Sequence, residues 1–160
     1  MTVTLTPEEE RIAKWVGHER QARNDGARVV DTRGSTTQSS EAIHVQGFRA
    51  ELAFCKLFNV YPDFDTRPRQ GSSDCARWGE SVDVKSTTLT HGRLLCFARK
   101  KELASDVYAL LIDDGPAFRF VGFARATELF TDAHLTDVGH GPAYALTQDE
   151  LTPTQRRGGT

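Results

Sequence analysis

The sequence predicts an α/β domain whose central sheet is mixed, mostly antiparallel and flanked by helices. Three observations predict this class. The chain has 160 residues, 38% hydrophobic and 26% charged, which is the size and composition of one ordinary globular domain. Two segments with helical spacing of apolar residues come first. Short runs rich in β-branched and aromatic residues, separated by turn residues, follow them.

The first helix is expected to begin after Thr6 and to end at residues 24–26. Thr6 is a capping residue, Pro7 suits the first helical position, and Glu9 completes a T-x-x-E capping box. The Asn-Asp-Gly sequence at 24–26 is typical of a helix end. A second helix is expected over 42–59, where the apolar residues predict a largely buried helix.

Most of the remaining chain is expected to form strands. Gly79-Glu80 is the predicted turn of a first hairpin, and Gly115-Pro116 lies near the turn of a second. The predicted strands cover 74–78, 81–87, 93–99, 106–114 and 117–125, and short helices are expected at 100–105 and 126–134.

One domain over residues 1–160 is expected, with its core at about 42–123. Residues 1–41 add the N-terminal helix and a polar loop, and residues 152–160 lack periodicity and predict a frayed tail. The N-terminus has no apolar signal core, and the longest apolar runs are far shorter than a membrane span. These features predict a cytoplasmic protein with no membrane partner.

The three cysteines, Cys55, Cys75 and Cys96, lie in apolar contexts, which predicts reduced core thiols. There is no CxxC pair or Cys/His cluster, so a structural zinc site is not expected.

The net charge of −2 hides an uneven distribution, because residues 67–101 contain 8 Lys/Arg against 3 Asp/Glu. A local positive field suits a polyanionic substrate, although a plain solvated basic surface is the alternative. The candidate phosphate contacts are Arg67, Arg69, Arg77, Arg93, Arg99, Lys100 and Lys101.

Two aspartates and a lysine are expected to meet on the first hairpin. With a turn at Gly79-Glu80, Asp74 would lie opposite Lys85 and diagonal to Asp83, all on one face. Two carboxylates this close repel each other unless a cation lies between them, and their oxygens suit a hard divalent ion. The alternative is a cross-strand salt bridge between Asp74 and Lys85, with Asp83 solvated.

Glu51 adds a third acidic residue, on an apolar face of the second helix. A carboxylate in such a position requires a partner, unless it lies at the edge of the helix and reaches water.

The acidic residues and the lysine lie in "ELAFCKLF" with Glu51, "GSSD" with Asp74 and "VDVKST" with Asp83 and Lys85. In this order and context, residues of about 42–123 resemble a small single-domain member of the PD-(D/E)XK nuclease superfamily. Ser73 stands where the superfamily name has proline, which is a frequent variation. Both acidic motif positions are Asp, and the shorter side chain still ligates metal.

The resemblance implies a restriction-endonuclease-like core and a Mg²⁺-dependent (or Mn²⁺-dependent) deoxyribonuclease. Asp74 and Asp83 would bind the metal with the backbone carbonyl of Val84, and Glu51 would hold the metal or its waters. Lys85 would act on the attacking water or on the transition state. With no separate sequence-reading domain, cleavage of DNA would be structure-selective or of low specificity, and either a homodimer or a recruiting protein partner is implied.

Two alternatives stay open. One is a catalytically inactive nucleic-acid-binding or assembly protein that keeps the nuclease fold. The other is a protein-interaction module in which the Asp-Val-Lys sequence is coincidental.

Overall fold

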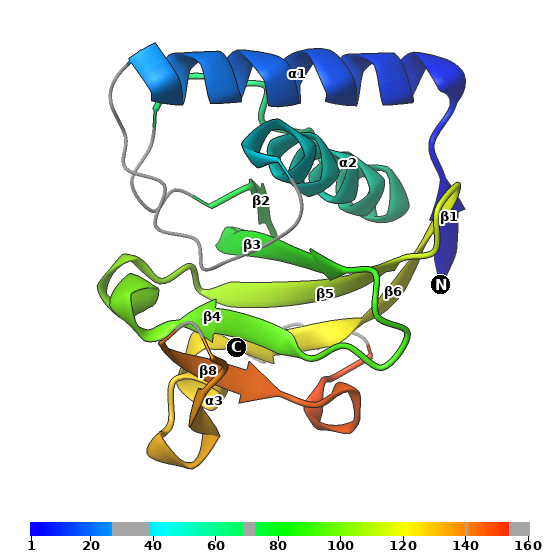
Figure 1. The fold of residues 1–160 in the computed structure, drawn as a ribbon. Coiled ribbons are helices and arrows are strands. Elements are labelled where there is room, and N and C mark those ends of the chain that lie inside the picture. Colours follow the sequence, from blue (N-terminus) through cyan, green and yellow to red (C-terminus); the bar gives the residue numbers. More distant parts are fainter. Residues whose placement is uncertain (27–38, 69–72, 140, 154–160) are drawn as a thin grey trace.

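The computed structural model describes residues 1–26, 39–68, 73–139 and 141–153. In Figure 1 the helices α1 (Pro7–Gly26) and α2 (Ser40–Phe58) lie on one side of a curved sheet, with α2 between α1 and the sheet. A smaller sheet covers the opposite face. The predicted α/β class is therefore confirmed.

The main sheet has five strands in the order β1-β6-β5-β3-β2. They are β1 (Thr2–Thr4), β6 (Ala117–Arg125), β5 (Val107–Asp113), β3 (Glu80–Thr87) and β2 (Cys75–Arg77). The strands β3 and β5 run parallel and the other neighbours are antiparallel, as expected for a mixed, mostly antiparallel sheet. A parallel pair needs a long crossover, which here contains β4 (Leu94–Phe97) and the 3₁₀ helix η1 (Ala98–Leu103).

The smaller sheet has the order β4-β8-β7, with β8 at Pro142–Leu146 and β7 at Leu135–Asp137. It packs on the main sheet through an apolar cluster that includes Tyr108, Leu110 and Tyr144. The strands β1, β7 and β8 were not expected from the sequence. The helix expected at 126–134 is shorter: α3 covers Ala126–Leu129, and the 3₁₀ helix η2 (Asp132–His134) follows it. A second 3₁₀ helix, η3 (Gln148–Glu150), follows β8.

Both main helices are capped by their own sequences. The Thr6 hydroxyl accepts a hydrogen bond from the Glu9 backbone N–H at 3.2 Å, and the Glu9 carboxylate accepts one from the Thr6 N–H at 2.6 Å, which confirms the predicted capping box. At the start of α2, the Ser39 side chain accepts a hydrogen bond from the Ala42 N–H. The helix ends at Asn59, whose φ of 52° is the left-handed conformation typical of a helix end.

The two helices cross closely at Gly17. A Cβ atom there would lie 2.7 Å from the Cα of Val45, so only glycine fits at this separation. Ala13 and Val16, beside the crossing, are also buried. The close crossing brings the next turn of α1, which carries Arg20, against α2.

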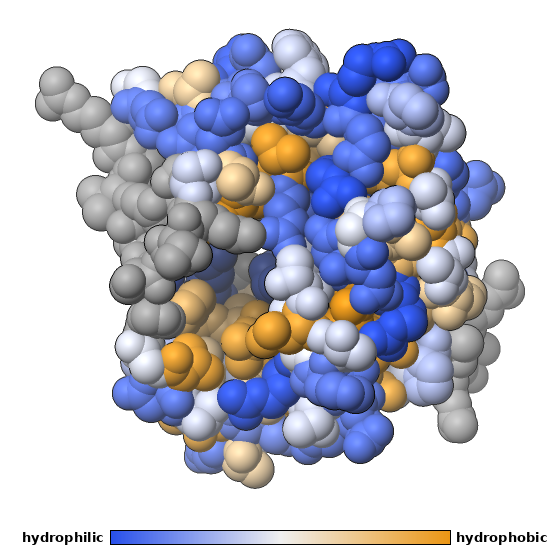
Figure 2. Space-filling model, turned by 45° about the vertical axis from the view of Figure 1, so that its right-hand side comes forward, coloured by the Kyte–Doolittle hydropathy of each residue, from blue (hydrophilic) through white to orange (hydrophobic). Residues whose placement is uncertain are grey.

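The main apolar cluster fills the layer between the helices and the sheet, where Phe48, Phe54, Val82 and Phe118 are fully buried. Hydrophilic residues cover much of the face shown in Figure 2, which has a hollow bordered on its lower side by hydrophobic residues. No helix in the described part of the chain is long and apolar enough to cross a membrane.

The first hairpin turns one residue earlier than expected. Cys75 pairs with Val82 and Arg77 pairs with Glu80, so the turn consists of Trp78 and Gly79, with φ of 54° and 80°. The predicted turn at Gly79-Glu80 is therefore wrong. A two-residue turn of type I′ needs positive φ at both positions, and tryptophan rarely adopts it. In the observed register, Asp74 falls opposite Asp83 rather than opposite Lys85.

Candidate active site

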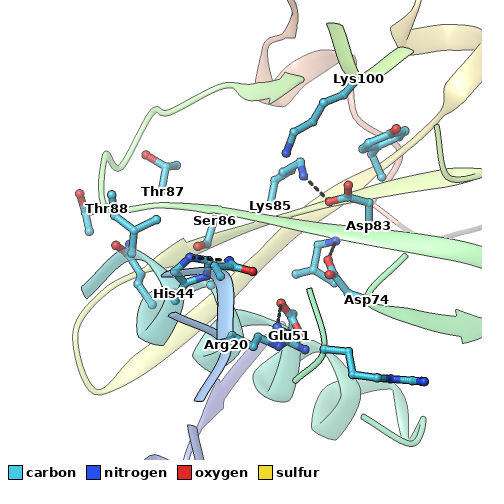
Figure 3. A pocket seen from close by; sticks show the side chains of 17 residues that line it. Arg20, His44, Glu51, Asp74, Asp83, Lys85, Ser86, Thr87, Thr88 and Lys100 are labelled. Atoms are coloured by element: carbon cyan, nitrogen blue, oxygen red, sulfur yellow. Dashed lines mark hydrogen bonds and ion pairs between the residues drawn. The ribbon is translucent and has the colours of Figure 1, made fainter. Parts of the chain in front are cut away.

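A cleft of about 680 Å³ follows the edge of β3 beyond the point where β2 ends. The strand β2 pairs with β3 only up to Val82, so from Asp83 onward this edge has no strand partner among the described residues. Side chains of α1, α2, β5 and η1 complete the walls (Figure 3). All five residues predicted for the metal and catalytic site line this cleft: Glu51, Asp74, Asp83, Val84 and Lys85.

Asp83 and Lys85 form an ion pair on one face of β3. They are two residues apart, so their side chains point the same way, and Lys85 Nζ contacts Asp83 Oδ1. Burial acts to lower the pKa of Lys85, but the charges of Asp83 and Asp74 outweigh it and raise this pKa above its ordinary value. Lys85 therefore stays protonated at neutral pH.

Asp74 lies at the point where the chain enters β2. Its backbone N–H donates to the carbonyl of Val82 at 2.9 Å, and its Oδ2 accepts a hydrogen bond from the N–H of Val84 at 2.6 Å. Burial, followed by the charges of Glu51 and Asp83, raises the pKa of Asp74 well above its ordinary value of 3.8. Such repulsion between carboxylates in a cleft is typical of functional sites.

Glu51 is 7% exposed and is held by Arg20 of α1. Arg20 Nη1 donates to both carboxylate oxygens of Glu51, at 2.9 and 3.0 Å. The same guanidinium donates to the backbone carbonyls of Asp63 and Asp65, at 3.0 and 3.3 Å, and lies 4.8 Å from the ring centre of Phe48. Glu51 is therefore a buried acid with a partner, and this partner, Arg20, lies outside residues 42–123.

Sequence reasoning missed Arg20 because nothing near it in the chain indicates a buried partner. Its pairing depends on the helix crossing at Gly17, which the sequence does not predict. The cleft also contains Asn24 and His44, whose Nδ2 and Nε2 atoms lie 3.5 Å apart, and Tyr108 of β5. None of these three was predicted as a site residue.

The three cysteines are free and buried, as expected for residues of the core. The interaction of the Cys55 thiol of α2 with the thiol of Cys75 of β2, together with burial, raises the pKa of Cys55. The contact joins the helix that carries Glu51 to the strand that follows Asp74.

Two of the predicted phosphate contacts line the cleft, and four other described ones do not. Arg67 and Lys100 line the cleft, although Arg67 is exposed and paired with Asp65. Arg69 lies outside the described residues. The other four, Arg77, Arg93, Arg99 and Lys101, do not line the cleft. The guanidinium of Arg77 lies 3.5 Å from the ring centre of Trp78, and that of Arg99 lies 4.5 Å from the ring centre of Phe97. Lys101 Nζ lies 3.4 Å from the hydroxyl oxygen of Tyr144, and Arg93 is exposed.

No group of three or more His, Cys, Asp or Glu side chains in the described part of the chain is already arranged to hold a metal ion. Asp83 faces Lys85, Glu51 faces Arg20, and Asp74 accepts a backbone N–H. The chemistry of the donors nevertheless fits a hard divalent cation, since the cleft offers carboxylate oxygens whose mutual repulsion such a cation would relieve. The Val84 N–H points to this edge, and in a strand its carbonyl points the same way.

Comparison with known proteins gives one family match. The model of DUF5843, described as a family of unknown function, matches residues 1–158. The chain belongs to the DUF5843 family. No curated protein and no solved structure matched the chain. The family match includes Arg20 of α1 together with the acidic residues and lysine of the cleft.

The Arg20–Glu51 pair is expected to be essential for stability. Replacing Arg20 by alanine leaves Glu51 buried without this partner, which should lower the free energy of unfolding by about 3–5 kcal/mol. Urea denaturation measures this loss. The control is Arg23→Ala on the exposed side of the same helix, which should change stability by about 0.5 kcal/mol or less. Equal effects of the two substitutions would show that the pair does not stabilise the fold.

The raised pKa of Asp74 predicts a pH-dependent effect of Asp74→Asn. Because the folded pKa lies above the unfolded one, the stabilising contribution of this carboxyl is complete below the unfolded pKa and is lost as pH rises through the folded value. Asparagine does not titrate. Without metal, the free energy of unfolding of the variant should therefore rise relative to that of the wild type from about pH 4 upward, by at most about 1.4 kcal/mol per pH unit. Denaturation in EDTA from pH 4 to 8 measures this, with exposed Asp132→Asn as the control. If the stability of Asp74→Asn relative to the wild type instead falls as pH rises, the pKa of Asp74 is not raised in the folded protein.

Proposed function

We propose that this protein is a metal-dependent nuclease that hydrolyses DNA phosphodiester bonds and has a restriction-endonuclease-like core of the PD-(D/E)XK type. One observation carries the proposal. Glu51, Asp74 and the Asp83–Lys85 pair come from three separate segments of the chain and line the same cleft. The raised pKa of Asp74 supports it further, because burial in the cleft and then the charges of Glu51 and Asp83 raise it.

The cofactor that fits is Mg²⁺ or Mn²⁺, held by Asp74, Asp83 and the carbonyl of Val84. When bound, it would supply positive charge to the phosphate and lower the pKa of a water molecule. Glu51 has both oxygens bonded to Arg20, so in this proposal it fixes the position of waters or shares its charge with the ion.

Lys85 would act either on the attacking water or on the transition state, and the second role fits its charge better. Its raised pKa keeps it an ammonium, so it suits stabilisation of the negative charge that develops on the phosphate oxygens, rather than removal of a proton from water. Its pairing with Asp83 holds it at the edge of β3, where the substrate would lie.

The substrate we propose is DNA, cut in a structure-selective or low-specificity manner. The partners we propose are DNA and either a second copy of the chain or a recruiting protein. The compartment we propose is the cytoplasm, because buried free thiols suit a reducing environment.

A second candidate function is a catalytically inactive nucleic-acid-binding or assembly protein with the same fold. The observation that favours it is the ion pairing in the cleft, where Arg20 holds Glu51 and Lys85 holds Asp83. Such pairs stabilise a structure without any metal. The two candidates differ in whether DNA is cut and whether divalent ions bind.

Cleavage should require divalent ions and both residues of the β3 pair. The wild type is incubated with supercoiled, linear, single-stranded and branched DNA in Mg²⁺, Mn²⁺ or EDTA. We expect cleavage in the metals only, and its loss in Asp83→Asn and in Lys85→Ala, because these remove a ligand and the ammonium beside it. The control is Arg11→Ala, which changes an exposed residue of α1 outside the cleft. Full activity in either site variant would remove the active-site assignment.

Divalent ions should also stabilise the fold. An ion that binds only the folded form adds about 2.7 kcal/mol at a hundredfold excess over its dissociation constant, which raises the melting temperature by several degrees. Thermal melting with EDTA or millimolar Mn²⁺ measures this.

Two variants sharpen the melting experiment. Asp74→Asn and Asp83→Asn should both lose the response to Mn²⁺. Only Asp83→Asn should also be less stable in EDTA, because it leaves the Lys85 ammonium without its carboxylate partner. A wild type that is indifferent to both Mn²⁺ and Mg²⁺ would favour the inactive alternative.

A further inference from the structure

Three consecutive cations on η1 point in three different directions. In a 3₁₀ helix each residue is rotated by about 120° from the one before it. Arg99 turns back over the ring of Phe97, and Lys101 turns to the hydroxyl of Tyr144. Lys100, between them, points into the cleft towards Lys85 (Figure 3).

The cations that line the described part of the cleft are paired with carboxylates, with one exception. Arg20 is paired with Glu51, Lys85 with Asp83, and Arg67 with Asp65. Within the described residues, no carboxylate lies within ion-pair distance of Lys100. Burial and the neighbouring charge of Lys85 lower the pKa of Lys100, as expected where two ammonium groups face each other across a cleft.

Lys100 is exposed to solvent, and the charge of Asp83 partly offsets that of Lys85, but two ammonium groups facing one cleft still create a local field that attracts an anion. A phosphate group between Lys85 and Lys100 would relieve the repulsion and give Lys100 the partner that it lacks, through a charge-assisted hydrogen bond. The phosphate that can reach both groups is the one next to Asp83 and Lys85, where we propose that the bond is cut.

We propose that Lys100 is a second cationic contact to the phosphate that is cleaved, acting beside Lys85. The inference rests on the proposed nuclease function and selects one residue from the basic sequence at 99–101. It gives Lys101 no role at the substrate, because Lys101 is directed at Tyr144.

The neighbouring lysines provide a matched pair for the test. Binding of a fluorescent DNA substrate is measured in EDTA, where no cleavage is expected, over a series of salt concentrations. Lys100→Ala should weaken binding about tenfold and reduce the salt dependence by about one phosphate contact. Lys101→Ala should stay within about twofold of the wild type, and Lys100→Arg should keep most of the affinity because it keeps the charge.

A chemical change in the DNA identifies the phosphate. The position of the cut is mapped first, and a neutral methylphosphonate then replaces the phosphate at that position. On this DNA, Lys100→Ala should bind as well as the wild type, because the charge that Lys100 contacts is already absent. Lys100→Gln keeps more of the side chain and should behave like Lys100→Ala, and thermal melting checks that each variant is folded.

The possible results distinguish a failure of the proposed Lys100 contact from a failure of the proposed nuclease function. If the wild type cuts DNA but Lys100→Ala and Lys101→Ala bind alike, the inference is wrong and the nuclease function stands. If Lys100→Ala loses the same affinity on normal and methylphosphonate DNA, Lys100 contacts another phosphate and the inference is also wrong. If the wild type cuts none of the DNA forms in Mg²⁺ or Mn²⁺, the proposed function fails and the inference fails with it.

Discussion

The buried pair between Arg20 and Glu51 is the interaction on which the arrangement of the cleft depends. One guanidinium joins α1, α2 and the segment that leads from α2 towards β2, because it binds Glu51 and the carbonyls of Asp63 and Asp65 at once. Breaking a buried pair by removing one partner is costly, so this contact fixes the two helices relative to each other. It also keeps the negative charge of Glu51 close to Asp74, which is one cause of the raised pKa there.

The position of the cleft follows from unequal strand lengths. The strand β3 extends several residues beyond its short partner β2, and this part of its edge, which opens to the cleft, has no strand partner in the part of the chain that the structure describes. On its other edge β3 pairs in parallel with β5, and the crossover between them carries η1 to the same place. Acidic residues from α2, from β3 and from the residue before β2 thus meet cations from β3 and η1.

Local signals in the sequence predicted their elements well. The capping box at Thr6, the buried second helix and the hairpin of β5 and β6 depend on residues close together in the chain, and all three are present. The motif residues also meet in one cleft. The hairpin turn was misplaced because its first residue is Trp78, whose positive φ no propensity rule favours.

Features that depend on distant partners were not predictable. The short strands β1, β7 and β8 exist only because another strand pairs with each of them, and their own sequences are weak signals. Arg20 and Glu51 find each other through a helix crossing that only the folded chain defines. Among the basic residues at 99–101, the direction of each side chain depends on whether the turn is 3₁₀ or α, which the sequence leaves undecided.

The first strand has a consequence for the order in which the chain can fold during synthesis. Thr2 pairs with Arg119 and Thr4 with Ala117, so β1 leaves the ribosome long before its partner exists. Until β6 emerges, the nascent chain carries β1 without this partner, next to Leu5, which is buried in the folded core. Such a distant pairing closes late and predicts slow completion of the sheet, after the helices have formed.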